Sequence, residues 1–325
     1  MFKILDDEFN IGKTCQRFVT EFQQSGGEKI NVRVGYHGGH VECKISWYGE
    51  LGIWMHSEII PGDRLWNAFG IGRPVGGENV SIICEINFPL KGIDRQVAGA
   101  FVTDNVGSVL VVHRGKIGGG RKGIGKTLFQ DNYRGQWISV EDGDVGTDVA
   151  LVGALNSPRF TRQVSQFVHE VGRIKSLVLA DRPPAHIAHQ AQGFRDEFAG
   201  RKRYTIGKQV EAQCDHGLIV GGLACILSSR GLKVGNDRRD LYIVGSTGNI
   251  TTIFEIKTDT STTSLYTALG QLMLYSVDLP VRPRLVLVVP QRVEEILEAR
   301  LNKLGIELLT YEWSGDKAVF AGLSR

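Results

Sequence analysis

The spacing of hydrophobic and polar residues changes along the chain. From about residue 29 to 155, short apolar segments such as NVRVGYHG, HVECKISWYG and SVLVVHRG are separated by turn residues. Segments of this length and punctuation predict an antiparallel sheet or barrel. A helix is expected over 12–24, and another begins near Ser157, with Phe160 and Val164 on one apolar face. We therefore expect residues 1–175 to form a β-rich domain.

The C-terminal part of the chain has a different pattern, in which segments of helical and strand length alternate. Helices are expected over 209–229, 263–277 and 291–305, and strands over 240–244, 250–258, 284–290 and 306–313. The run RLVLVVP is nearly all apolar, which is typical of a central strand with both faces covered. Residues 208–325 are therefore expected to form an α/β domain. Residues 176–207, which include Pro183-Pro184, are interpreted as a linker.

Charged residues in the expected hairpin over 240–258 are the first sign of chemistry. Residues two apart on a strand share a face, so Glu255 and Lys257 point the same way. Pairing back from the turn GSTGN brings Asp240 beside the end of the second strand. Two carboxylates and the backbone carbonyl of Ile256 could hold Mg²⁺ or Mn²⁺ there. Such an ion could activate water for phosphodiester cleavage, with Lys257 supplying positive charge.

These residues resemble a known catalytic motif. Asp240 followed by Glu255-Ile256-Lys257 is similar to the D…E-x-K form of the PD-(D/E)XK nuclease superfamily, although Arg239 stands where the motif has proline. Gln271-Leu-Met-Leu-Tyr275 resembles the Q-x-x-x-Y motif of its RecB-like branch. The resemblance covers about 208–313.

The resemblance implies a restriction-endonuclease-like fold, a mixed sheet flanked by helices. It implies that Asp240 and Glu255 bind the metal, that Lys257 serves catalysis, and that Gln271 and Tyr275 place the DNA backbone. The branch often has a further acidic or histidine residue on the leading helix. Glu211, Asp215 and His216 are the choices here, and we rank Glu211 first.

Composition limits the class of protein and its expected cellular location. The 325 residues are 42% hydrophobic and 22% charged with a net charge of +3, so the chain is globular and any nucleic-acid surface must be local. The five scattered cysteines form no C-x-x-C pair, which indicates reduced thiols and no zinc site. The first residues lack the apolar core of a signal peptide, and no stretch has the ~18 apolar residues that span a bilayer. We expect a cytoplasmic protein without a membrane partner.

A second motif lies in the N-terminal half. Residues 120–127, GRKGIGKT, match the P-loop pattern, which would make the chain a nucleotide triphosphatase using Gly120–Thr127. A P-loop directly follows a strand and opens a helix, whereas here the apolar strand ends near Val112 and Arg134-Gly135 soon interrupts any helix. The same glycine-rich loop fits a clamp on the DNA backbone. Its cations are Arg114, Lys116, Arg121, Lys122 and Lys126.

We therefore expect an endonuclease acting on double-stranded DNA, restriction-like, with residues 1–175 recognising a sequence or a modified base. Aromatic residues that could stack on bases are Trp47, Trp54, Trp66 and Phe69. A cut through both strands needs two active sites, so a homodimer is expected. A DNA repair nuclease fits the motif equally well, and a DNA-binding sensor with an inactive nuclease fold is a further alternative.

Overall fold

The computed structural model describes residues 2–36, 38–104, 107–118, 123–178, 207–236, 239–277 and 279–323, with the side chains of 207–211 left out. The chain divides into two compact units. The N-terminal unit contains the described residues up to 178, and the C-terminal unit those from 212 onward. The linker expected over 176–207 lies almost entirely outside the described residues.

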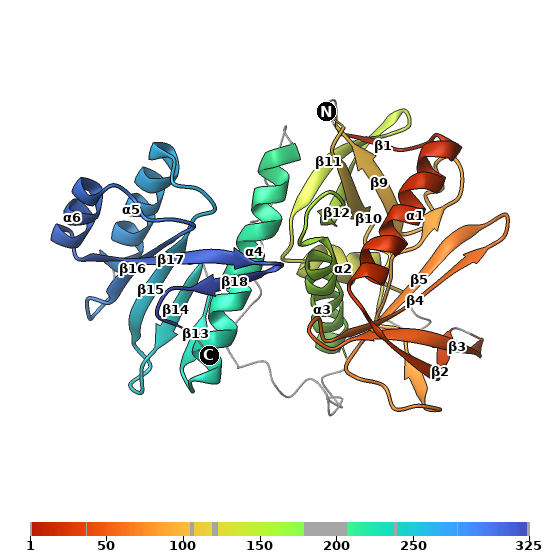
Figure 1. Ribbon diagram of the computed structural model, residues 1–325, viewed down its shortest axis with the longest axis horizontal. Coiled ribbons are helices and arrows are strands. Elements are labelled where there is room, and N and C mark those ends of the chain that lie inside the picture. Colours follow the sequence, from red (N-terminus) through yellow and green to blue (C-terminus); the bar gives the residue numbers. More distant parts are fainter. Residues whose placement is uncertain are drawn as a thin grey trace. The chain divides into compact units, whose positions relative to one another are not determined.

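The N-terminal unit consists mainly of strands, in two sheets (Figure 1). Its strands are β1 (Phe2–Ile4), β2 (Glu28–Tyr36), β3 (Gly39–Tyr48), β4 (Ile53–Ile60), β5 (Arg64–Ile71), β6 (Asn79–Ser81), β7 (Cys84–Glu85), β8 (Phe88–Pro89), β9 (Gly99–Thr103), β10 (Val109–His113), β11 (Trp137–Asp142) and β12 (Val145–Ala154). Its helices are α1 (Glu8–Gln24), α2 (Lys126–Asn132) and α3 (Phe160–Val178). One sheet is a closed barrel in the order β1-β11-β12-β10-β9. The other has the order β6-β2-β3-β4-β5-β7, with β8 paired to β5.

The core of this unit is rich in aromatic side chains. Phe160, Phe167 and Val171 recur at helical spacing on α3 and are fully buried. The ring of Phe160 lies 5.6 Å from that of Phe18 on α1. Burial of several large apolar side chains at about 1.5–3 kcal/mol each explains why these helices pack against each other and why α3 packs on strands of this unit.

Two of the expected base-stacking residues belong to this buried interior. Trp54 is 2% exposed and Phe69 is fully buried, so the stacking interpretation is wrong for both. Their apolar area is used in packing, as it is for most large aromatic side chains on strands. Trp47 and Trp66 are partly buried at the edge of a smaller apolar cluster on the second sheet.

The C-terminal unit contains one mixed sheet with helices on both faces (Figure 1). Its elements are α4 (Gly207–Ser229), β13 (Lys233–Gly235), β14 (Leu241–Val244), β15 (Ile250–Ile256), α5 (Thr262–Val277), β16 (Arg284–Val289), α6 (Glu295–Lys303), β17 (Ile306–Ser314) and β18 (Lys317–Phe320). The strands lie in the order β13-β14-β15-β16-β17-β18. Neighbours from β15 to β17 are parallel and the outer pairs antiparallel. The expected mixed α/β architecture is confirmed, and the short strands β13 and β18 were not predicted.

The two faces of this sheet are covered by different helices. Phe254 and Ile256 of β15 pack in the same cluster as Leu223 of α4, whereas Ile253 packs with Leu272 of α5 and with residues of α6. This division follows from the alternation of side chains along a strand. It also leaves Glu255, which alternates with these residues, on the face covered by α5. Among the described helices, none combines the length and apolar content that crossing a bilayer requires.

Candidate active site

Asp240 and the end of β15 meet at one edge of the C-terminal sheet. Leu241 pairs with Phe254, so Asp240, one residue before β14, lies level with the end of β15. Its Oδ2 accepts a hydrogen bond of 2.6 Å from the backbone N–H of Ile256. Asp240 is 7% exposed and Glu255 is fully buried. The register of the hairpin therefore brings together the residues that the sequence interpretation paired.

His216 of α4 contacts Asp240 and the end of β15 from the face of the sheet that α4 covers, which is opposite the face covered by α5. Its Nε2 lies 3.2 Å from Oδ2 of Asp240 and 3.1 Å from the carbonyl oxygen of Ile256. His216 precedes the buried Ile219 by three positions, so the packing of α4 on the sheet directs both side chains inward.

The sequence interpretation ranked Glu211 above His216 on this helix. The side chain of Glu211 lies outside the described residues, and Asp215 is buried. The signal that could have selected His216 was its spacing from the apolar positions that face the sheet, at Ile219 and Leu223.

Lys257 is held between a strand and a helix. Its Nζ donates to Oε1 of Glu255 at 2.6 Å and to Oε1 of Gln271 on α5 at 2.9 Å. The backbone N–H of Lys257 donates to the carbonyl of Val288 at 2.9 Å, which extends the pairing with β16 beyond the end of β15. The shared face of Glu255 and Lys257, and the contact with Gln271, fix the ammonium group beside the Glu255 carboxylate.

Tyr275 lies one turn beyond Gln271 on α5 and meets Arg239 rather than Lys257. Arg239 donates from Nη2 to the carbonyl of Tyr275 at 3.1 Å. The guanidinium carbon of Arg239 lies 5.7 Å from the ring centre of Tyr275 and 5.9 Å from that of Tyr242. The residue preceding Asp240 is thus bound to two aromatic rings, a favourable arrangement for a guanidinium ion.

The charge of Glu255 is strongly affected by its surroundings. Burial and then the negative charge of Asp240 raise the pKa of Glu255 to about 7, against opposing effects of Lys257 and His216. One of its oxygens, Oε2, is buried and has no hydrogen-bond partner. A buried carboxylate oxygen without a donor is unfavourable, and a cation nearby would stabilise it.

The chemical types of the oxygen atoms at this edge suit a hard divalent cation. Carboxylates such as those of Asp240 and Glu255 and a carbonyl oxygen such as that of Ile256 are the donors that Mg²⁺ and Mn²⁺ prefer, and two carboxylates with several waters are a usual magnesium set. No group of three or more His, Cys, Asp and Glu side chains is arranged to hold a metal within the described part of the chain. The fit therefore rests on two carboxylates and a carbonyl.

No family model and no curated protein matches this sequence. Among solved structures, the chain is similar to a repair endonuclease from Pyrococcus abyssi, with 11% identity, a TM-score of 0.24, and coverage of 96% of this chain and 98% of that chain. A likeness at this level does not establish a shared fold.

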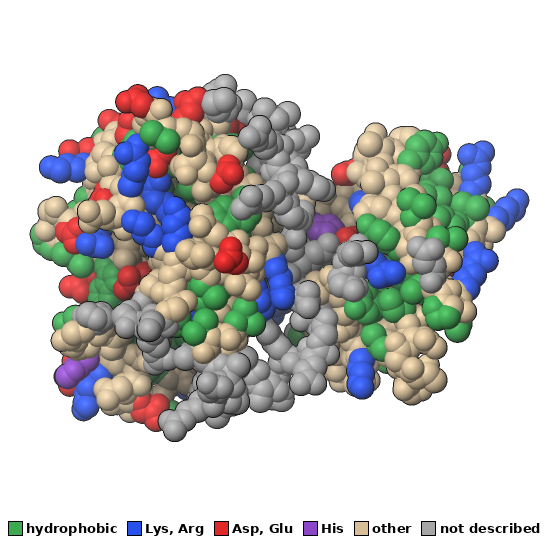
Figure 2. Space-filling model, turned by 180° about the vertical axis from the view of Figure 1, so that it is seen from behind, with side chains coloured by type: hydrophobic (Ala, Val, Ile, Leu, Met, Phe, Trp, Pro, Cys, Tyr) green, Lys and Arg blue, Asp and Glu red, His purple; other side chains and the backbone are tan. Residues whose placement is uncertain are grey.

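The cations of the glycine-rich loop are not equivalent. Arg114 is buried and its guanidinium contacts the buried carboxylate of Asp142, so it stabilises the barrel and offers no charge to a ligand. Lys116 and Lys126 are exposed, and the Nζ of Lys116 donates to the carbonyl of Arg95 at 2.7 Å. Arg121 and Lys122 lie outside the described residues. Lys and Arg side chains also gather on the face of the N-terminal unit seen in Figure 2.

The strand and helix on either side of the glycine-rich loop do not have the arrangement of a P-loop. The strand β10 ends at His113, well before Gly120, which lies outside the described residues. Lys126 is the first residue of α2, a helix of only seven residues. A nucleotide-binding P-loop joins the end of a strand directly to a longer helix, so the elements on either side of this segment do not support a nucleotide triphosphatase.

Proposed function

We propose that this chain is a metal-dependent endonuclease that hydrolyses phosphodiester bonds in double-stranded DNA. The observation that carries the proposal is the convergence of Asp240, Glu255 and the Ile256 carbonyl at one sheet edge, with the Lys257 ammonium beside them. The order of these elements, a helix, a hairpin with both carboxylates and a helix with Gln271, also agrees with the PD-(D/E)XK resemblance.

Asp240, Glu255 and the carbonyl of Ile256 are the proposed ligands of Mg²⁺ or Mn²⁺. When bound, the ion supplies Lewis-acid chemistry, polarising the scissile phosphate and lowering the pKa of a coordinated water. The Oε2 atom of Glu255 supports this role. Lys257 pairs with the other oxygen, Oε1, whereas Oε2 is buried without a hydrogen-bond donor and would be stabilised by a bound cation.

His216 and Lys257 have different roles in the proposal. His216 orients Asp240 through the 3.2 Å contact with its Oδ2, as residues behind metal ligands commonly do. Lys257 places a positive charge beside the reacting phosphate and stabilises the negative charge that develops there. Gln271 fixes the direction of this ammonium through its 2.9 Å hydrogen bond.

In the proposal the N-terminal unit selects the DNA. Lys116 and Lys126 are exposed, and with Arg121 and Lys122 of the same loop they would contact phosphates. Base recognition, of a sequence or a modified base as in restriction enzymes, is assigned to this unit, with Trp47 and Trp66 as partly exposed aromatic residues. Repair of damaged DNA uses the same catalytic chemistry and differs in the DNA that is recognised.

The test is cleavage of supercoiled plasmid, methylated and unmethylated, in Mg²⁺, in Mn²⁺ and in EDTA. We expect nicked or linear products with metal and none with EDTA. Glu255→Gln should abolish cleavage and preserve DNA binding, whereas Glu312→Gln, an exposed acid of the same unit, should cut normally. DNA binding in Mg²⁺ without any product would instead identify an inactive nuclease fold that senses DNA.

A further inference from the structure

The outward face of α5 carries no charged side chain. The helix sequence TTSLYTALGQLMLYSV contains neither acid nor base. After the exposed first residue Thr262, its exposed positions follow one stripe along the helix, which we call the α5 stripe: Thr263, Tyr266, Thr267, Gly270, Leu274 and Val277. Tyr266 is 68%, Leu274 70% and Val277 74% exposed. Helices on a protein surface usually present charged and polar residues to water, so a stripe of this kind indicates a partner.

Gly270 lies at the centre of the stripe, and the space beside its Cα is open. A Cβ atom added at Gly270 would meet no other heavy atom within 4 Å. Glycine in the middle of a helix is unfavourable relative to alanine, because it increases the entropy of the unfolded chain. Its advantage at such a position is close approach of another backbone, here one that comes from outside the chain.

We infer that the α5 stripe is the contact between two copies of this chain, packed antiparallel with a twofold axis at Gly270. In a twofold interface, residue i contacts residue j of the partner and the reverse contact is identical. The stripe has this symmetry in its own spacing. Tyr266 and Leu274 each lie four positions from Gly270, and Thr263 and Val277 each lie seven. In an antiparallel pair, Tyr266 of one copy therefore lies opposite Leu274 of the other, and Thr263 lies opposite Val277.

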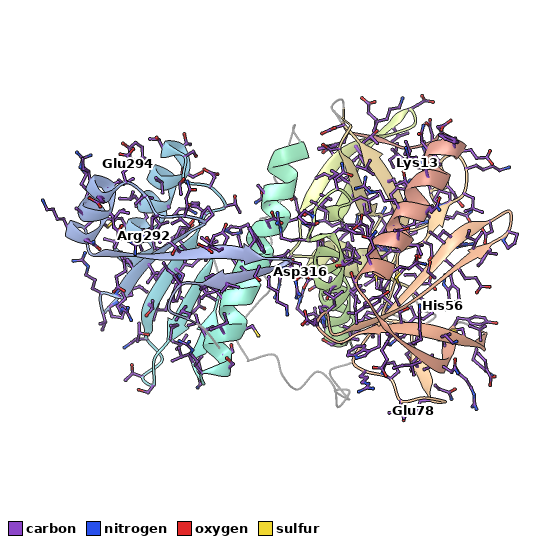
Figure 3. The ribbon with its side chains drawn as sticks, in the orientation of Figure 1. Lys13, His56, Glu78, Arg292, Glu294 and Asp316 are labelled. Atoms are coloured by element: carbon purple, nitrogen blue, oxygen red, sulfur yellow. The ribbon has the colours of Figure 1, made fainter. Side chains whose placement is uncertain are left out.

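Charge and dipole favour a second copy over a different partner. Two uncharged stripes meet without burying an ion, which would otherwise carry a large desolvation cost. Antiparallel packing also sets the positive end of each helix dipole beside the negative end of the other. The next helix differs, since Arg292 and Glu294 lie at the amino end of α6 (Figure 3) and further charges follow along it. Figure 2 shows hydrophobic side chains on the surface of the same unit.

This inference is independent of the proposed nuclease activity, because it depends only on the exposed face of α5. If the nuclease proposal is also correct, the twofold contact lies on the helix whose Gln271 holds Lys257, so each dimer would contain two cutting sites. Two sites in one assembly are what a cut through both DNA strands requires.

The test is the mass of the full-length chain by analytical ultracentrifugation over about 1 to 100 µM, a range that reports dissociation constants of weak to moderate complexes. We expect the wild type to dimerise and Leu274→Glu to raise the dissociation constant at least about 100-fold, because each substitution enters a twofold interface twice. Ile296→Glu is the matched control: Ile296 is 67% exposed on α6, outside the stripe, and its substitution should leave dimerisation within about twofold of wild type.

A second variant places a thiol on the proposed axis. Gly270→Cys should form a disulfide-linked dimer under mild oxidation, and the wild type, with Cys225 as its exposed thiol, serves as the background. The inference is overturned by a wild type that stays monomeric at 100 µM, by dimers of Leu274→Glu as stable as wild type, by equal dissociation of Ile296→Glu, or by absence of the Gly270→Cys cross-link.

Discussion

Lys257 donates a hydrogen bond of 2.9 Å from its Nζ to Oε1 of Gln271, a residue 14 positions further along the chain. The strand residue carries the positive charge, and the helix residue decides where that charge points. An ammonium group on four rotatable carbons is a poor catalyst until such a partner limits its motion.

Gln271→Ala should therefore reduce the rate of DNA cleavage at saturating DNA about 10- to 100-fold, with little change in KM. The reason is that the Lys257 ammonium would then pair with Glu255 alone and lose its second anchor. Single-turnover cleavage and thermal melting would measure the effect. Gln271→Glu keeps an oxygen acceptor and should retain more activity; equal loss in both variants would contradict this explanation.

His216→Ala should lower metal-dependent cleavage about 10- to 100-fold, the usual effect of removing a residue that orients a metal ligand. The imidazole holds Oδ2 of Asp240 and the carbonyl of Ile256 through its Nε2. Titration of Mg²⁺ against the cleavage rate would show the loss as a higher metal requirement. His216→Gln retains a donor and should recover part of the activity, while wild-type behaviour of the alanine variant would remove His216 from the site.

The raised pKa of Glu255, about 7, predicts how metal binding responds to pH. Below this pH, Glu255 in the folded protein is mostly protonated, but a carboxylate must be ionised to bind a metal. Affinity for Mg²⁺ or Mn²⁺ should therefore fall about tenfold for each pH unit below 7 and level off above it. Calorimetric titration with Mn²⁺ between pH 5.5 and 8.5 measures this, with Asp259, an exposed acid, changed to Asn as control. A flat profile would disprove proton competition at Glu255.

Substitutions of Arg114 and Lys126 should differ in their effects on stability and on DNA binding, although both residues were expected to contact DNA. Arg114→Ala leaves the buried carboxylate of Asp142 without its buried guanidinium partner, and should destabilise the N-terminal unit by about 3 kcal/mol. Lys126→Ala removes an exposed charge and should leave stability unchanged, while lowering the salt dependence of DNA affinity by about one unit of slope. Urea unfolding and binding at several salt concentrations separate these effects, and the reverse pattern would exchange the two assignments.

His113 should make the N-terminal unit sensitive to acid. The side chain is fully buried, and its burial lowers the pKa to about 4. Its Nδ1 accepts from the N–H of Gly115 at 3.0 Å, and its Nε2 lies 3.1 Å from the carbonyl of Glu85. The neutral ring, protonated at Nε2, satisfies both contacts. The charged ring would also carry a proton on Nδ1, which would then face the N–H of Gly115. Because the folded pKa is below the unfolded value near 6.5, stability is complete above that value and is lost as pH falls toward 4.

The expected loss at His113 is about 3 kcal/mol between pH 7.5 and 4. Urea unfolding followed by tryptophan fluorescence would measure it. His113→Gln carries no titrating group and should be less stable at neutral pH but lose less on acidification. An identical pH dependence in both proteins would assign the acid sensitivity to other groups.

The sequence was sufficient for most of the architecture. The polar and apolar alternation at the end of β15, the continuous apolar run of β16 and the apolar stripes of the helices are local patterns, so a β-rich part and an α/β part could be predicted. The facing of Glu255 and Lys257 could be predicted for the same reason, since it depends only on the period of a strand. The short strands β13 and β18 could not, because three or four residues carry too little pattern.

Contacts between distant segments were decided by tertiary packing alone. Periodicity says which face of α4 is apolar, but only the angle at which the helix crosses the sheet brings His216 to Asp240. In the same way, Arg114 and Lys126 are similar cations in the sequence. Only the folded unit buries Arg114 against Asp142 and leaves Lys126 exposed to water. The physical reason is that periodicity is a property of neighbours along the chain, whereas burial and pairing depend on which remote segments fill the remaining space.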